Sequence, residues 1–131
     1  MAETFVVAAA VVEARGRFLV TRRQKGVHLE GYWEFPGGKC EPGESLAACL
    51  RRELREELGV DARIGGEVFT TMHSYPERRV ELHFLRCDLV GDPQPLVGQD
   101  MRWVPRDELR SLEFPPADVE LIRALTRTEA P

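Results

Sequence analysis

Residues 38–60 read GKCEPGESLAACLRRELREELGV, and they hold the clearest structural signal in the chain. Four leucines recur every four residues, the spacing that lines one face of an α-helix; they are Leu46, Leu50, Leu54 and Leu58. Ser45 is a typical N-cap residue, and Gly59 stands where a left-handed C-cap residue is expected. The stretch therefore predicts a capped helix that follows a loop rich in glycine and proline.

The same helix carries glutamates beside its leucine face. At about 100° per residue, Glu53, Glu56 and Glu57 fall within an arc of about 100°. Helices rich in Glu and Arg are usually solvated surfaces, but like charges one turn apart repel unless a cation lies among them. Magnesium prefers oxygen ligands and commonly links one or two carboxylates to substrate phosphates. The cluster therefore predicts a Mg²⁺ site, with Mn²⁺ as a possible substitute, and a polyphosphate ligand.

Strand patterns lie on both sides of this helix. Apolar runs at residues 5–12 and 18–21, separated by Gly16, predict a hairpin. Residues 24–43 lose periodicity and contain several Pro and Gly residues, so a loop without helix or strand is expected there. Residues 62–71 and 79–90 are rich in β-branched and aromatic residues and predict two further strands, and residues 101–104 add one more.

A second helix is expected near the C-terminus, where Pro115 and Pro116 form a helix start. Its inner side should carry four apolar residues, namely Val119, Leu121, Ile122 and Leu125. Strands on either side of a central helix, closed by a second helix, indicate an α/β fold in layers. Cys49 and Met72 are interpreted as core residues.

Composition restricts the class of protein. The 131 residues, 43% of them hydrophobic, suit a single domain spanning 1–131, and no apolar run approaches the roughly 18 to 20 residues of a membrane span. Three cysteines without a CxxC pair favour reduced thiols, and the N-terminus lacks a signal peptide, so a cytoplasmic protein is expected. The net charge of −4 argues against binding a nucleic-acid polymer.

The central stretch also resembles a known family motif. Its specified positions match the Nudix box in full: Gly38, Glu44, Arg52, Glu53, Leu54, Glu56, Glu57, Gly59 and Val60. A phosphate-binding Walker loop is rejected, because Trp33 and Cys40 stand where that motif needs Gly and Ser or Thr. Flanking segments at 21–23, 33–39 and 114–118 are similar to the MutT branch of the Nudix hydrolases.

The resemblance implies an α/β/α sandwich with a mixed β-sheet, and hydrolysis of a nucleoside triphosphate to nucleoside monophosphate and pyrophosphate by attack at the β phosphorus. It implies metal ligands at Glu53, Glu56, Glu57 and the backbone carbonyl of Gly37 or Gly38, with Glu53 as the general base. Arg52 and Glu44 are expected to brace these glutamates. No partner beyond the nucleotide is implied, and a monomer or weak dimer is expected.

The resemblance also implies a nucleotide pocket. Its expected residues are Arg23, His28, Glu34, Phe35, Pro36, Gly37, Lys39, Arg78 and Asp118. Taken singly, Arg23 would be a surface cation and His28 a solvated loop residue; matched spacing to the motif favours the pocket. Tyr75 and Arg78 lie on a turn between strands and would either clamp the ligand or form a solvated hairpin end.

Two positions depart from the MutT pattern. Asp118 stands where an asparagine usually reads 8-oxoguanine, and an ionised carboxylate only accepts hydrogen bonds. The leading substrate is 8-oxo-dGTP, with CTP or 5-methyl-dCTP as the alternative. Val97 occupies the place of a further glutamate, which Asp100 or Glu77 would have to replace. A non-catalytic binding module and a hydrolase of nucleotide sugars or dinucleoside polyphosphates are the remaining alternatives.

Overall fold

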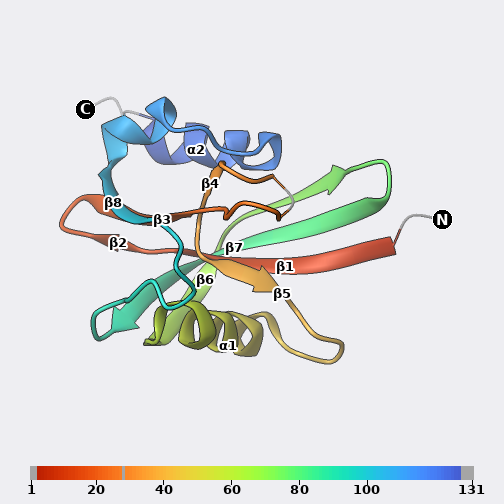
Figure 1. The fold of residues 1–131 in the computed structure, drawn as a ribbon, viewed down its shortest axis with the longest axis horizontal. Coiled ribbons are helices and arrows are strands. Elements are labelled where there is room, and N and C mark those ends of the chain that lie inside the picture. Colours follow the sequence, from red (N-terminus) through yellow and green to blue (C-terminus); the bar gives the residue numbers. More distant parts are fainter. Residues whose placement is uncertain (1–2, 28, 128–131) are drawn as a thin grey trace.

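The chain folds into two β-sheets that lie between two helices (Figure 1). The structure, a computed structural model, describes residues 3–27 and 29–127. The first sheet has the strand order β5-β1-β7-β6. Its strands are β1 (Glu3–Val11), β5 (Gly37–Lys39), β6 (Asp61–Ser74) and β7 (Arg78–Val90). Strands β1 and β7 run parallel, whereas β5 and β6 pair antiparallel to their neighbours, so the predicted mixed sheet is confirmed.

The second sheet is built around β3 (Arg17–Arg22), which pairs with three other strands. These are β2 (Glu13–Ala14), β4 (Trp33–Glu34) and β8 (Met101–Pro105). A 3₁₀ helix, η1 (Arg106–Ser111), follows β8, and a second, η2 (Pro116–Asp118), leads into the C-terminal helix α2 (Val119–Thr126).

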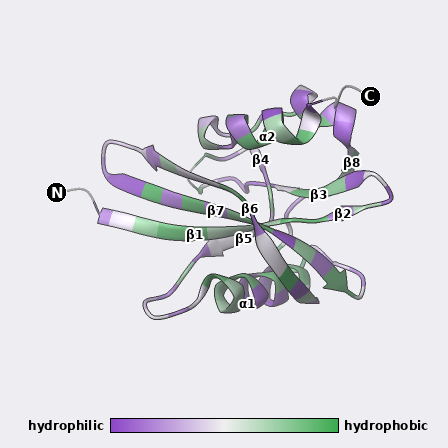
Figure 2. Ribbon diagram, turned by 180° about the vertical axis from the view of Figure 1, so that it is seen from behind, coloured by the Kyte–Doolittle hydropathy of each residue, from purple (hydrophilic) through white to green (hydrophobic). Residues whose placement is uncertain are grey.

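Helix α1 (Leu46–Leu58) covers one face of the first sheet, and α2 lies on the opposite side of the molecule (Figure 1). Successive residues of a strand point to opposite faces, so β1 supplies both layers. Ala8 and Ala10 pack in the cluster that contains α1, whereas Ala9 and Val11 pack in the cluster that contains α2. Figure 2 shows this as hydrophobic residues along β1 and an alternation of hydrophobic and hydrophilic residues along α1.

The expectation of a loop without strands over residues 24–43 is wrong within 33–39, where Trp33–Glu34 forms β4 and Gly37–Lys39 forms β5. Gly37 and Gly38 allow a strand to form in this glycine-rich segment. A Cβ atom at Gly37 would collide with the carbonyl oxygen of Ala8 and with the Cα atom of Ala9, the residue that faces Gly37 across the strand pair. The backbone of β5 can therefore approach β1 more closely than a chain with side chains could.

The N-terminal hairpin forms only at its turn, where β2 pairs with β3. Residues 5–11 instead belong to β1 in the other sheet, a choice that depends on long-range pairing with β7. The strands predicted at 62–71, 79–90 and 101–104 are confirmed, with the first extended at both ends as β6.

Three expectations about side chains are wrong. Val119 is 44% exposed, because it occupies the first position of α2, whereas Leu121 and Ile122 are buried as expected. Met72 is 46% exposed on β6 and is not a core residue. Cys40 and Cys49 form a disulfide rather than two reduced thiols, because the β5 strand and the first turn of α1 bring them together, and only Cys87 is a free thiol. Within the residues that the structure describes, no helix is long and apolar enough to cross a membrane.

Candidate active site

The glutamate helix is fixed at both ends and along its apolar face. The Ser45 hydroxyl accepts a hydrogen bond from the Ala48 backbone N–H at 3.1 Å, and Gly59 ends the helix in the left-handed conformation. Leu50, Leu54 and Leu58 are fully buried against the sheet. The helix therefore has one rotational setting, and its glutamate flank faces the edge where β5 ends.

Strand β5 meets this flank at Gly38. A Cβ atom at Gly38 would collide with the carboxyl group of Glu53, so any larger residue there would displace that carboxyl group. The approach places a backbone segment of β5 directly against the expected general base. The resemblance implies that the carbonyl of Gly37 or Gly38 and the side chain of Glu53 are both metal ligands, and the two groups lie side by side.

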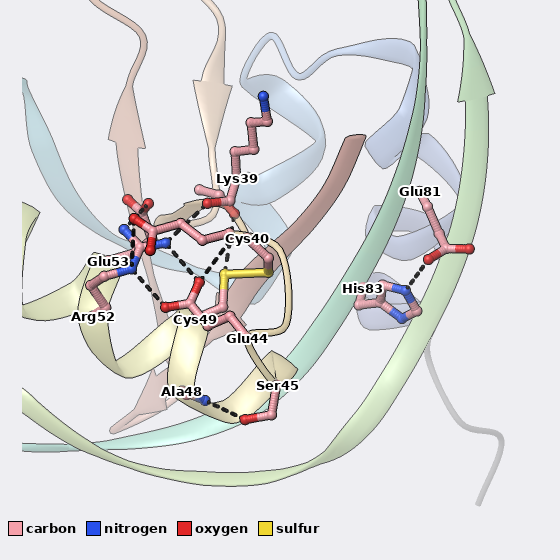
Figure 3. Close-up of a disulfide and its surroundings, with 12 residues drawn as sticks. Lys39, Cys40, Glu44, Ser45, Ala48, Cys49, Arg52, Glu53, Glu81 and His83 are labelled. Atoms are coloured by element: carbon pink, nitrogen blue, oxygen red, sulfur yellow. Dashed lines mark hydrogen bonds and ion pairs between the residues drawn. A yellow bond between two sulfur atoms is a disulfide. The ribbon is translucent and has the colours of Figure 1, made fainter. Parts of the chain in front are cut away.

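Arg52 organises the flank through its guanidinium group. Its Nε and Nη2 donate to the two carboxylate oxygens of Glu44 at 2.8 and 2.9 Å, a bidentate pair. The same group donates to Glu53 Oε1 at 2.9 Å and to the Lys39 carbonyl oxygen at 3.1 Å. These bonds lower the pKa of Glu44 to about 2 and raise the pKa of Arg52. Arg52 thus ties helix, preceding loop and β5 together around Glu53, as Figure 3 shows.

Glu57 completes a crowded acidic group. Burial, together with the nearby carboxylates of Glu34 and Glu53, raises the pKa of Glu57 to about 8. Neighbouring carboxylates that disfavour one another's negative charge suit a hard divalent cation. Glu56 lies further out: its side chain is 59% exposed and Arg52 contacts it at 3.4 Å. The donor set therefore fits a hard divalent cation, with Glu53 and Glu57 inside and Glu56 at the rim.

A cavity of about 360 Å³ adjoins this group at Gly38 and Glu34. It is lined by β1, β7, the β4–β5 segment and the start of η2, and its walls are mainly apolar. Seven of the expected pocket residues line it: Arg23, Glu34, Phe35, Gly37, Lys39, Arg78 and Asp118. Tyr75 lines it as well, so the turn between β6 and β7 belongs to the pocket rather than to a solvated hairpin end.

Two carboxyl groups line the cavity, of which Glu34 is partly buried and Asp118 is buried. Arg23 Nη1 donates to Glu34 Oε2 at 2.9 Å, yet burial still raises the pKa of Glu34. Asp118 is 5% exposed, and burial together with the charge of Glu34 raises its pKa to about 7. Burial, together with the charge of Asp118, raises the pKa of Tyr75, which places the phenol near this carboxyl group. One wall of the cavity can therefore offer hydrogen-bond donors as well as acceptors.

The sequence did not single out Phe5, which lines the cavity. Lys39 Nζ is 3.8 Å from the centre of the Phe5 ring, and the Arg78 guanidinium carbon is 5.3 Å from it. Phe5 thus gathers two cations near the route to the glutamates. Three alternate residues of β1 line the cavity, namely Phe5, Val7 and Ala9. This period of two was the sequence signal that could have identified Phe5.

Other expected residues lie elsewhere. Pro36 is fully buried below the cavity wall, and its carbonyl accepts from the Ala10 N–H at 2.7 Å. His28 lies outside the described residues. Val97, Asp100 and Glu77 are exposed, and none of them lines the cavity that the described residues form. Asp100 is 4.0 Å from Arg22, and the Val97 carbonyl accepts from Gln24.

Comparison with known proteins agrees with this geometry. The family model described as NUDIX domain matches residues 7–124. The chain is 36% identical over 125 residues to the CTP pyrophosphohydrolase of Escherichia coli K12, covering 95% of this chain and 93% of that protein. It is 34% identical to the 8-oxo-dGTP diphosphatase of Haemophilus influenzae, covering 91% and 89%.

Solved structures give the same result. The solution structure of the E. coli ORF135 protein superposes with a TM-score of 0.83 at 35% identity, covering 94% of this chain and 89% of that one. The MutT protein from Methanosarcina mazei Go1 superposes with a TM-score of 0.85, covering 95% and 94%, but at 23% identity it bears on the fold alone.

Proposed function

The chain belongs to the NUDIX family of hydrolases, and from that premise we propose that it is a divalent-metal-dependent nucleoside triphosphate pyrophosphohydrolase. The observation that carries the proposal is the pairing of the Glu53 and Glu57 carboxylates with an adjacent apolar cavity large enough for a nucleoside. The whole chain would act as one catalytic domain, since α1 and α2 enclose opposite sides of the same sheets.

The residues suggest how the substrate lies. The base would occupy the apolar cavity, and the triphosphate would extend past Lys39 and Arg78 toward Gly38 and the glutamates. Both side chains line the cavity and carry positive charge. They would offset the negative charge of the phosphates. The overall charge of −4 makes this local cationic contribution necessary.

We assign the bound cation to Mg²⁺, with Mn²⁺ as a substitute, held by Glu53, Glu56, Glu57 and the carbonyl of Gly37 or Gly38. Such a cation offsets phosphate charge and lowers the pKa of a nearby water. Glu53 accepts the proton of the attacking water, a new bond forms from that oxygen to the β phosphorus, and the bridge to the α phosphate breaks. Nucleoside monophosphate and pyrophosphate leave. Arg52 and Glu44 hold Glu53 in position during this step.

We propose 8-oxo-dGTP as the leading substrate. Oxidation at C8 turns N7 into a donor beside the O6 acceptor, and a protonated carboxyl group can accept from one and donate to the other. The raised pKa of Asp118, about 7, makes the protonated form available near neutral pH. Asp118 would thereby perform the role of the asparagine that it replaces.

CTP or 5-methyl-dCTP is the second candidate. A cytosine also presents a donor beside an acceptor, the N4 amino group and N3, which a protonated Asp118 could pair with equally. Glu34 supplies a further acceptor on the same wall of the cavity. The similarity to the E. coli CTP pyrophosphohydrolase over 95% of the chain also favours this candidate.

The remaining parts of the proposal concern the cell. We propose that the enzyme acts on free nucleotides in the cytoplasm, as a monomer or weak dimer and without binding nucleic-acid polymers. The net negative charge supports the last point, because polymer binding usually requires clustered Lys and Arg.

A substrate panel tests the proposal. Purified protein with Mg²⁺ is incubated with 8-oxo-dGTP, dGTP, CTP, 5-methyl-dCTP and ADP-ribose, and the products are separated by chromatography. We expect monophosphate and pyrophosphate from 8-oxo-dGTP, with a preference over dGTP of more than about tenfold, or about 1.4 kcal/mol. A stronger preference for the cytosine nucleotides would select the second candidate. No turnover of any compound would refute hydrolysis.

A further inference from the structure

Two cysteines link β5 to α1, the two elements that carry the proposed metal ligands. Cys40 directly follows β5, Cys49 lies in the first turn of α1, and the two form a disulfide. Figure 3 shows this bond beside Glu44 and Arg52. The Cys49 sulfur is fully buried, whereas Cys40 is partly exposed. The pair therefore has one side that reagents in solution can reach.

The disulfide lies close to the glutamates of the proposed metal site. Cys49 Sγ lies 3.7 Å from the carbonyl oxygen of Gly38, which is itself a proposed metal ligand. The next carbonyl along, that of Lys39, accepts from Arg52, and Arg52 also donates to Glu53. The disulfide thus fixes β5 to α1 within one or two contacts of the residues that would hold the cation.

From this arrangement we propose that Cys40 and Cys49 form a reversible oxidation site, closed by peroxides and opened by dithiols, whose closure tightens cation binding at the adjacent glutamates. The inference rests on the proposed metal site. A closed disulfide holds the Gly38 carbonyl and Glu53 in one geometry, so less order remains to be created when the cation binds. In the reduced form, the Cys49 thiol can donate to the Gly38 carbonyl and compete with the cation for that oxygen.

The chemistry balances with a peroxide as oxidant. The Cys40 sulfur attacks one oxygen of hydrogen peroxide, the O–O bond breaks, and the leaving hydroxide takes up the thiol proton as water. The Cys49 sulfur then attacks the Cys40 sulfenic acid. The S–O bond breaks and a second water leaves with the Cys49 proton. A dithiol reverses the change by taking the disulfide bond onto its own sulfurs.

Two other uses of these cysteines fit the structure less well. Cys40, Cys49 and Glu44 offer ligand atoms within 4.8 Å of one another. Glu44 is already bound in bidentate fashion by Arg52, which leaves two sulfurs, short of the four ligands of a structural zinc site. Cys87 cannot replace either partner, because it is buried in the α1 cluster and burial raises the pKa of its thiol to about 12.

The test measures cation binding without nucleotide. Wild-type protein is treated with dithiothreitol or with hydrogen peroxide, the reagent is removed, and the Kd for Mn²⁺ is measured by electron paramagnetic resonance, with the disulfide mapped by mass spectrometry. We expect the peroxide-treated protein to bind Mn²⁺ at least about threefold more tightly. Cys40→Ser should bind like the reduced protein under both treatments, and Cys87→Ala should respond like the wild type.

Each other result has a distinct meaning. Equal Mn²⁺ affinity in the two redox states, tighter binding by the reduced protein, or failure of peroxide to join Cys40 to Cys49 would overturn the redox inference while leaving the metal site intact. A response that persists in Cys40→Ser would also overturn it, since it would come from another residue. Absence of Mn²⁺ binding in both states would instead refute the proposed metal site, and the redox inference with it.

Discussion

Asp118 combines burial with a position on the wall of the cavity, and its charge should govern base recognition. Its pKa near 7 means that the carboxyl group loses its donor as the pH rises through neutrality. We expect the KM for 8-oxo-dGTP to rise above about pH 7 in the wild type. Asp118→Asn keeps a donor at all pH values and should show a flat KM profile. Steady-state kinetics between about pH 6 and pH 9 would decide, and matching profiles would disprove the role of Asp118.

The same residue should make stability depend on pH. The pKa of Asp118 rises from 3.8 to about 7 on folding, so the folded state holds the proton more tightly and loses stability as the pH rises from about 4 to 7. Because each pKa unit corresponds to about 1.36 kcal/mol, Asp118→Asn should gain up to about 3 kcal/mol relative to the wild type between about pH 5 and pH 8. Urea unfolding at both pH values measures this. Parallel changes in the two proteins would contradict it.

Glu53 is the expected base, and its replacement should affect catalysis rather than folding. Glu53→Gln keeps the shape of the side chain but cannot take up the proton, so kcat should fall by about 10²- to 10⁴-fold. Glu108→Gln, an exposed change on η1, is the matched control and should leave kcat unchanged. Retention of more than about a tenth of the wild-type kcat by Glu53→Gln would assign the base to another group.

At the scale of elements, Arg52 holds the helix, the loop and β5 in register around Glu53. Arg52→Lys keeps the charge but loses the bidentate contact with Glu44 and the simultaneous bonds to Glu53 and Lys39. We expect kcat/KM to fall about 10- to 100-fold. Arg51→Lys, one position earlier and exposed, should be neutral. If the two variants had equal activity, the network would have no bearing on catalysis.

Elements differ in how far the sequence predicts them. Helix α1 could be predicted with both of its ends, because its leucine spacing, Ser45 and Gly59 are all local signals. Strand β5 could not, because its pairing depends on the close approach of Gly37 to Ala8, more than 25 residues away. Glycine reads as a loop residue until its partner strand is known.

The candidate site shows the same division. The metal-binding flank follows from the motif on one helix, whereas the cavity brings together β1, β7 and η2. The sequence therefore did not identify Phe5 as a cavity residue, although the period of two that it shares with Val7 and Ala9 was visible. The disulfide escaped for a related reason: Cys40 and Cys49 are nine residues apart in sequence, and only the turn from β5 into α1 brings them together.

At the scale of the molecule, the two helices pack on opposite sides of the sheets. The candidate site combines residues from both of these layers. The α1 layer supplies acidic groups for the cation, and the α2 layer supplies Asp118 and the remaining cavity wall. Gly38 lies where the two regions meet, since it contacts Glu53 and also lines the cavity. In the proposed function, this arrangement would place the triphosphate between the region that binds the base and the region that binds the cation.

The account depends most on cation-assisted attack of water at the β phosphorus. Hydrolysis of 8-oxo-dGTP, or of the nucleotide that the panel selects, in ¹⁸O-labelled water with Mg²⁺ measures this directly, with mass spectrometry of both products. We predict that the label enters pyrophosphate and not the monophosphate, and that excess chelator abolishes turnover until Mg²⁺ is restored. Label in the monophosphate, or full turnover in chelated buffer, would contradict the account.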